Sequence, residues 1–346
     1  MTKVLFGILL VMSLTISASA MEIEAPEVPK SGMSRMPEET DSFGEALLEL
    51  IQTSVKLIQP ELEEAVKVCF GILCCAMLFS VLPVFTERIT AAVSIAGTTT
   101  IAAMMFRHTE TMISCAADAV WEICEYGKLL CPVLTTALAA QGGVTASAAL
   151  YTGTTAFNAL LSMLVSRWIV PMVYIFLLFS IANCALGTEI LKKFADAVKS
   201  ILQWLLKTLL IVFTTYMSIT GVISGVTDAA ALKATKVVMS TAVPVVGGIL
   251  SDASESVLVS MGVMKNAAGI YGILAVLAVF VGPFIKVGVQ YLLLKVSAAI
   301  CSLFAAKNIS ALVEDFSAAM GLLLAMVAVS CLLILISTVC FLKGLG

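Results

Sequence analysis

The sequence predicts an all-α protein that crosses a membrane several times. Of its 346 residues, 60% are hydrophobic and only 12% are charged, and the mean hydropathy is +1.07. A soluble domain is about half apolar and one-quarter charged, so this composition is that of a polytopic membrane protein. Apolar runs long enough for the hydrocarbon core recur along the chain. We expect seven or eight transmembrane helices, together with amphipathic and partial helices.

The N-terminus has the pattern of an export signal. Residues 1–20 carry the positive charge of Lys3 near their start, followed by a short apolar run, and they end on Ala18-Ser19-Ala20. This pattern is typical of a signal peptide. An uncleaved first membrane helix is the alternative. Residues 21–41 are acidic, rich in proline and poor in large apolar groups, so we expect a disordered extracytoplasmic tail.

An amphipathic helix is predicted at residues 42–60, before a polytopic domain at 61–346. Ser42 and Glu45 have the spacing of a capping box, and apolar residues then recur at intervals of three and four. We expect this helix to end at Pro60. It either lies on the membrane surface or packs on a partner helix, and packing is favoured.

The remaining chain divides into apolar segments separated by charges. The segment 114–128 carries acidic residues with Trp121 and Tyr126 at helical spacing, which indicates an interfacial helix. The basic loop 189–200 marks the cytoplasmic side. The segment 129–155 consists mainly of small residues and is expected inside a helix bundle. The expected membrane segments are 65–85, 89–106, 129–155, 168–186, 201–226, 267–285, 287–306 and 318–342.

A block of turn-forming and charged residues interrupts the apolar chain at 244–270. Proline and paired glycines can break a helix, and Asp252 and Glu255 share a helix face at a spacing of three. This face either lines a polar path or belongs to a loop whose charges are solvated at the interface, and the second interpretation is slightly favoured. Lys295 lies near the middle of a predicted span. The candidate conduit residues are Pro244, Gly247, Gly248, Asp252, Glu255, Lys265, Asn266 and Lys295.

Proline spacing is consistent with an internal repeat. Pro132 precedes Pro171 by 39 residues, and Pro244 precedes Pro283 by the same interval. Units at about 115–226 and 228–342 would each contain an acidic segment, a proline-led helix, a hairpin and a basic loop. Repeats with broken helices at corresponding positions are frequent in transporters.

Several function classes are excluded by the absence of their motifs. A net charge of −3 provides no basic face for nucleic acid. No phosphate-binding Gly-rich loop or protease motif occurs, so we expect no enzyme and no cofactor. His108 is the sole histidine and no Cys-x-x-Cys occurs, so no metal site is expected. Most of the ten cysteines are expected to be small buried hydrophobes, with a disulfide among Cys115, Cys124 and Cys131 as the alternative.

The 244–270 block, Lys307-Asn308, Glu314-Asp315-Phe316-Ser317 and Met320-Gly321-Leu322 resemble the stage III sporulation protein AE family. The resemblance covers nearly the whole chain. It implies a multi-pass protein of the cell membrane, in the outer forespore membrane contributed by the mother cell. It also implies a place in the channel that links mother cell and forespore during engulfment, with a role in forespore gene expression afterwards.

The implied partners are the lipid bilayer, ring-forming subunits, an ATPase and a forespore-side protein, with further copies of this chain as another candidate. Nucleic acid is not among them. Two other functions stay open: a stand-alone secondary transporter that uses the broken helices as its substrate site, and a non-conducting scaffold of the complex.

Overall fold

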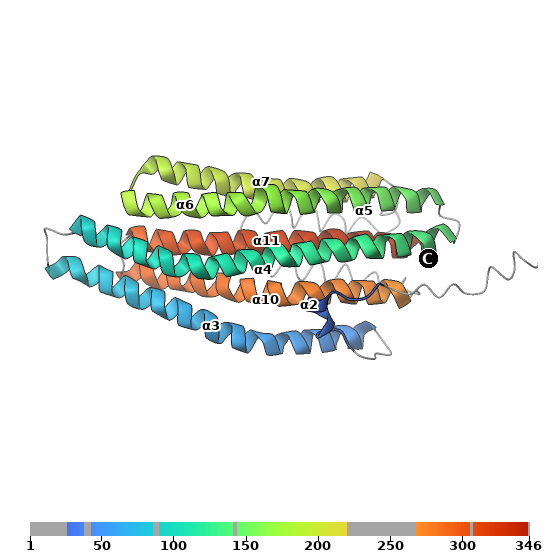
Figure 1. Cartoon of the computed structure of the whole chain (residues 1–346), viewed down its shortest axis with the longest axis horizontal. Coiled ribbons are helices and arrows are strands. Elements are labelled where there is room, and N and C mark those ends of the chain that lie inside the picture. The colour runs from blue at the N-terminus through green and yellow to red at the C-terminus, as the bar shows by residue number, and fades with distance from the viewer. Residues whose placement is uncertain are drawn as a thin grey trace, which may run out of the picture.

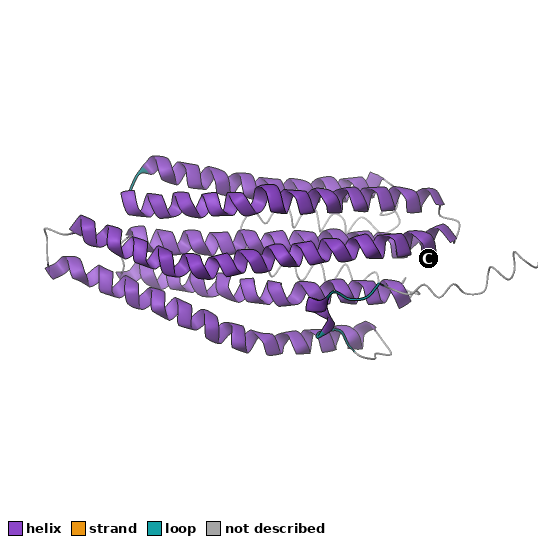
Figure 2. Cartoon of the chain, in the orientation of Figure 1, coloured by secondary structure: helices purple, strands orange, loops and turns teal. Residues whose placement is uncertain are grey.

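The computed structural model describes residues 26–37, 43–85, 90–140, 144–219, 267–304 and 307–344. These residues form an elongated bundle of long helices that lie side by side along one axis (Figure 1). No strand occurs among them (Figure 2), which confirms the all-α prediction. The elements are α2 (Lys30–Met33), α3 (Phe43–Phe85), α4 (Thr90–Ala140), α5 (Val144–Leu164), the π-helix η2 (Val165–Ile169), α6 (Val170–Leu186), α7 (Glu189–Ile219), α10 (Ala267–Phe304) and α11 (Lys307–Gly344).

Helix α11 forms the centre of the bundle. It packs against α10, α4, α6, α5 and α7, and most of its apolar stretch is buried. Helix α3 lies at one edge, on α10 and α4, and α7 lies at the opposite edge, on α6, α11 and α5 (Figure 1). The outer faces of these two edge helices are therefore free to contact lipid, water or other proteins.

Five helical runs in the described part of the chain are long and apolar enough to cross a membrane. They are Gly44–Val81, Val144–Leu186, Glu189–Ser218, Ile270–Phe304 and Lys307–Leu342. The expected seven or eight spans are therefore not confirmed. The runs are also long: the 38 residues of α10 extend about 57 Å, nearly twice a hydrocarbon core of about 30 Å.

Several residues expected to end helices lie inside them. Helix α3 continues through Pro60, so the predicted boundary there is wrong. The predicted segments 267–285 and 287–306 form the single helix α10, with Lys286 inside it. The interfacial helix expected at 114–128 is the middle of α4, and the basic loop expected at 189–200 is the first part of helix α7. A single charge does not end a helix when a neighbouring helix supplies a partner for it. A proline inside a helix removes one backbone hydrogen bond and crowds the carbonyl one turn earlier, which can kink the helix without ending it.

Pro171 shows how the bundle accommodates a proline. It lacks the N–H that would bond to the carbonyl of Arg167, one turn earlier. The five residues of η2, which include Arg167, form one π-helical turn at this point. The extra residue in that turn lets α5 and α6 continue as one run from Val144 to Leu186.

Small and polar residues hold α5 against its neighbours. A Cβ added at Gly153 would lie 2.0 Å from Cε1 of Tyr216, so α5 and α7 approach closely at this glycine. Asn158 is buried, and its Nδ2 donates a hydrogen bond to the carbonyl of Cys124 on α4 at 2.6 Å. The contact at Gly153 lies within the segment 129–155 and agrees with the prediction that this small-residue segment packs against other helices.

Residues 26–37, here called the strap, lie against the bundle, although we expected the whole of 21–41 to be disordered. Val28 is buried, and a Cβ on Gly32 would lie 2.9 Å from Cγ2 of Val279 on α10. Prolines at both ends of the strap reduce the conformational entropy lost on docking. The predicted signal peptide and the rest of the predicted tail lie outside the described residues.

Candidate functional site: a charged cavity beside Gly282 and Pro283

Helix α10 carries a Gly-Pro pair at its middle. Pro283 has no N–H, so the carbonyl of Val279 loses its helical partner. Gly282 has no side chain, and the guanidinium of Arg35 occupies the space above it. A Cβ added at Gly282 would lie 2.4 Å from Nη2 of Arg35. The pair therefore creates a seat for a cationic side chain on α10.

Arg35 is fixed in this seat by backbone carbonyls. Its Nη1 donates to the carbonyl of Ala278 on α10 at 2.9 Å and to the carbonyl of Ser31 in the strap at 2.9 Å. Burial lowers the pKa of the Arg35 guanidinium, and the neighbouring Cys115 and Glu122 oppose that shift. An arginine side chain remains protonated in proteins, so the seat holds a partly buried positive charge.

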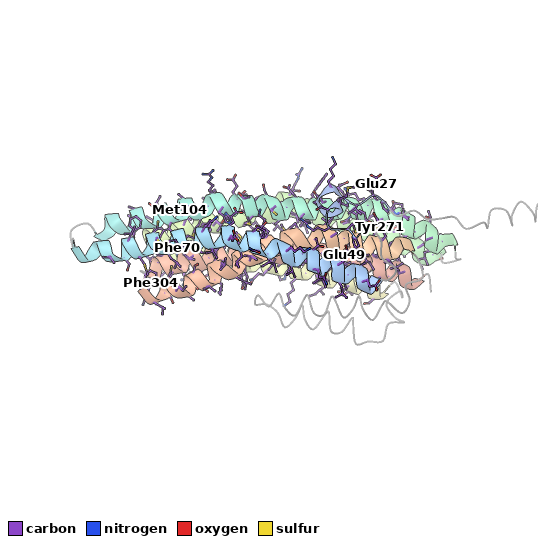
Figure 3. The ribbon with its side chains drawn as sticks, turned by 90° about the horizontal axis from the view of Figure 1, so that it is seen from below. Glu27, Glu49, Phe70, Met104, Tyr271 and Phe304 are labelled. Atoms are coloured by element: carbon purple, nitrogen blue, oxygen red, sulfur yellow. The ribbon has the colours of Figure 1, made fainter. Side chains whose placement is uncertain are left out.

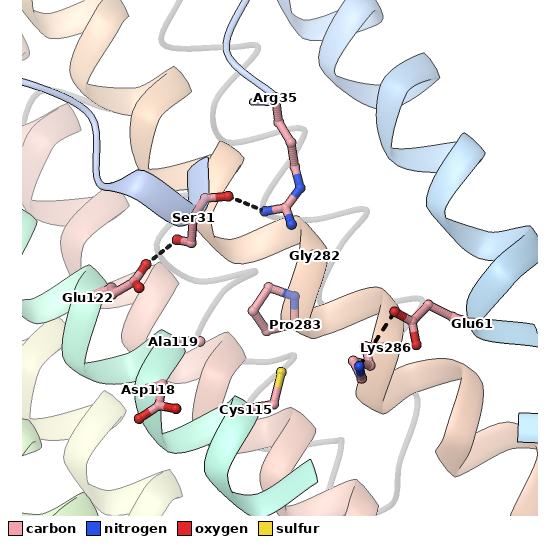
Figure 4. Close-up of a pocket in the computed structure, with 10 residues that line it drawn as sticks. All are labelled: Ser31, Arg35, Glu61, Cys115, Asp118, Ala119, Glu122, Gly282, Pro283 and Lys286. Carbon is pink, nitrogen blue, oxygen red and sulfur yellow. Dashed lines mark hydrogen bonds and ion pairs between the residues drawn. The ribbon is translucent and has the colours of Figure 1, made fainter. Parts of the chain in front are cut away.

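A cavity of about 340 Å³ lies beside this seat (Figure 4). The strap, α3, α4 and α10 each contribute to its wall. It is lined by Ser31, Arg35, Glu61, Cys115, Asp118, Ala119, Glu122, Gly282, Pro283 and Lys286. Three carboxylates and two cationic groups thus meet where the strap, α3, α4 and α10 come together.

Two of these carboxylates have partners across the cavity. Nζ of Lys286 lies 3.7 Å from Oε1 of Glu61 on α3, and the hydroxyl of Ser31 donates to Oε2 of Glu122 on α4 (Figure 4). Asp118 is exposed and forms no hydrogen bond or ion pair with the described residues. Burial raises the pKa of the Cys115 thiol. The arrangement can bind charged groups and hold water.

No cluster of three His, Cys, Asp or Glu side chains in the described ranges is placed to hold a metal ion. All ten cysteines are free and most are buried, as expected for small apolar side chains. The alternative of a disulfide among Cys115, Cys124 and Cys131 is therefore wrong. The three residues lie at different turns of the single helix α4, which keeps their sulfur atoms apart.

Most residues predicted from the sequence to line a conduit cannot be placed relative to this cavity. Pro244, Gly247, Gly248, Asp252, Glu255, Lys265 and Asn266 lie outside the described residues and stay predictions. Lys295 lies away from the cavity wall. Its Nζ pairs with Oε1 of Glu314 at 2.8 Å, and both side chains are at least half exposed.

The sequence interpretation missed the residues that line the cavity. It assigned Arg35 to a disordered tail and placed Lys286 at the boundary between two predicted spans. The signal that pointed to this site was the Gly282-Pro283 pair, which lies within an apolar helix one turn before Lys286.

The fold and cavity define a class: an all-α protein with several helices suited to a membrane and a charged site between them. A family model described as Stage III sporulation protein AE matches residues 31–343, and the chain belongs to this family. It is not a known enzyme family. The Stage III sporulation protein AE of Bacillus subtilis (strain 168) is 24% identical over 188 residues. That match covers 54% of this chain and 47% of the relative, so it spans about half of each. No solved structure matches the chain.

Proposed function

We propose that the chain is a multi-pass membrane subunit of the sporulation channel complex that connects mother cell and forespore. In this proposal it resides in the outer forespore membrane and is required for forespore development after engulfment. Other chains supply the ring-forming subunits, the ATPase and the forespore-side partner. Family membership supports the role in sporulation, and the five apolar helical runs support the membrane location.

The distribution of exposed charge carries the proposal that the chain works within an assembly. Helix α3 exposes Glu45, Glu49 and Lys56 in its N-terminal half. Helix α7 exposes Lys192 and Lys193 in its N-terminal half. These two halves lie at opposite ends of the bundle (Figure 1).

Between the two ends, Asp118 and Lys128 are also exposed. A hydrocarbon layer of about 30 Å therefore meets exposed charge wherever it crosses the described bundle, which is costly in lipid. Additional protein that covers part of this surface removes the conflict.

Exposed apolar side chains on the same edge helices favour the same conclusion. On α3, Glu49 and Phe70 both lie on the outer face (Figure 3), and Phe70 is 68% exposed. On α7, Phe194 and Trp204 are 54% and 63% exposed. Since the bundle is longer than a bilayer is thick, lipid cannot cover all of these groups, and large exposed apolar areas outside a bilayer mark protein interfaces.

Within the assembly, we propose that the chain forms part of a polar conduit. The cavity beside Gly282 and Pro283 supplies one charged site between α3, α4 and α10. The block with Asp252 and Glu255 supplies a second polar surface in the proposal, lining or closing the same path. A non-conducting scaffold would tolerate loss of these charges as long as its outer surfaces stay intact.

A second candidate function is that of a stand-alone secondary transporter. The observation that favours it is the cavity itself, which lies beside the Gly-Pro pair of α10, because transporter substrate sites lie beside irregular helices. A transporter binds a specific small solute and works without the other channel components. The exposed charge at every level of the bundle favours the channel subunit over this candidate.

The proposed function is tested in a sporulating host whose own copy of this protein is deleted. The full chain should restore a forespore-specific reporter after engulfment, and a tagged copy should label the outer forespore membrane. Asp252→Ala with Glu255→Gln should reduce the reporter at normal protein level if the conduit claim holds. Normal sporulation in the deletion strain would contradict the function, and full rescue by the double variant would favour the scaffold.

A further inference from the structure

We infer that the crevice between α4 and α10 is a receptor site for an arginine-bearing peptide segment, and that the strap is its removable ligand carried in the same chain. The site is defined by the seat for Arg35 on Gly282 and by the carboxylate of Glu122. This inference does not depend on the proposed function, because it concerns the chain's own segment and cavity.

The seat is matched to a guanidinium group. Gly282 provides a flat backbone surface against the planar group, and the carbonyl of Ala278 accepts a hydrogen bond from its edge. Arg35 also donates to the carbonyl of Ser31, so one side chain both closes the turn of the strap and joins it to α10. The planar group presents its donors in a fixed geometry that a lysine ammonium cannot reproduce.

The rest of the strap adds a few contacts that set its position. Ser31 bonds to Glu122 on α4, and Gly32 allows close approach to Val279 on α10. Together with Val28 and Arg35, these residues attach a short segment to two helices. A ligand must therefore offer an arginine one turn after a small residue to fit the crevice.

The attachment is removable because few apolar side chains hold it. Val28 is buried and Met36 packs against the core, but Met33 is 56% exposed and Lys30 is exposed to solvent. The bundle does not need the strap for its own packing, because α3, α4 and α10 contact one another directly. Loss of the Arg35 contacts should therefore release the strap while the bundle stays folded.

Release of the strap would open the charged cavity. Ser31 and Arg35 form one wall, and Cys115 forms part of another (Figure 4). Cys115 is half-buried, so its reaction with a maleimide reports whether the strap is in place. Cys74 is exposed on α3 within the apolar run Gly44–Val81, so it provides an internal reference for a membrane-permeant maleimide, and Cys331, which is buried, reports unfolding.

The test measures maleimide labelling of each cysteine in the purified full chain by peptide mass spectrometry. Arg35→Ala should raise the Cys115 rate relative to Cys74 about tenfold, the factor expected when a docking equilibrium loses one charge-assisted hydrogen bond. Lys30→Ala removes an exposed charge from the same strap and should change the rate less than about twofold. If the strap stayed in place, loss of the Arg35 charge would raise the pKa of the Cys115 thiol and slow its labelling. A faster labelling rate at Cys115 therefore reports opening of the cavity.

A second variant separates release from misfolding. In Gly282→Ala, the new methyl group takes the place of the guanidinium, while alanine favours the helical state of α10. Its Cys115 rate should also rise. A synthetic peptide of residues 26–37 should then protect Cys115 in the Arg35→Ala chain, and the same peptide with Arg35→Ala should not.

Three results would overturn the inference. The first is an unchanged Cys115 rate in both variants. The second is a parallel rise at Cys331, which would make the strap an integral part of the fold. The third is failure of the peptide to protect Cys115 at saturating concentration.

Discussion

The ion pair between Glu61 and Lys286 gives a direct test of the charged cavity. Their atoms lie 3.7 Å apart, and the two side chains are 27% and 28% exposed. At an effective dielectric constant of about 20, this distance corresponds to a gross attraction of about 4 to 5 kcal/mol. Desolvation and the ordering of two long side chains offset most of it, which leaves a coupling energy of about 1 kcal/mol.

A double-mutant cycle measures that coupling. Glu61→Gln, Lys286→Met and the double variant are compared by equilibrium unfolding in mixed detergent micelles. Each single variant should lose about 1 to 2 kcal/mol, and the double variant should lose about 1 kcal/mol less than the sum. The exposed pair of Lys295 and Glu314 is the matched control, with an expected coupling below about 0.5 kcal/mol. Additive losses at Glu61 and Lys286 would refute the partly buried ion pair.

Two further changes test the packing that positions the cavity. Gly153→Ala should destabilise the bundle by about 1 to 2 kcal/mol in thermal unfolding. The new methyl group displaces the Tyr216 ring and breaks the 2.9 Å hydrogen bond from Tyr216 to the carbonyl of Ala149. Thermal unfolding that matches the parent chain would contradict the close approach of α5 and α7. Asn158→Asp should lower the stability of the bundle by more than about 3 kcal/mol, because it buries a carboxylate where the amide group donated to the carbonyl of Cys124. Asn158→Leu should change the stability by only about 1 kcal/mol in the same assay. Equal effects of the two Asn158 variants would show that the position is hydrated.

The helical class was predictable from composition, but helix ends were not. Apolar runs separated by charges suggested separate spans, and the charge at Lys286 was taken as a boundary. In the structure Glu61 on another helix provides its partner, so α10 continues. Pro60 likewise lies inside α3. Such outcomes depend on contacts between distant segments, which local periodicity does not contain.

The cavity was less predictable than the fold. The average composition of residues 21–41 indicates disorder, yet one arginine in that segment fits a seat formed by Gly282. Neither residue is unusual by itself, and the site exists only where the strap and α10 meet. The sequence did identify Lys295 as a charge within an apolar helix, and the structure gives it an exposed partner, Glu314.

We propose that the chain works as a subunit of a larger membrane assembly. This proposal is tested most directly by the mass of the full chain in native membrane discs, prepared with and without co-expressed components of the sporulation channel. We expect a stable complex of defined stoichiometry that contains this chain and those components. A solitary monomer that binds a small solute and ignores the other components would contradict it and favour the transporter.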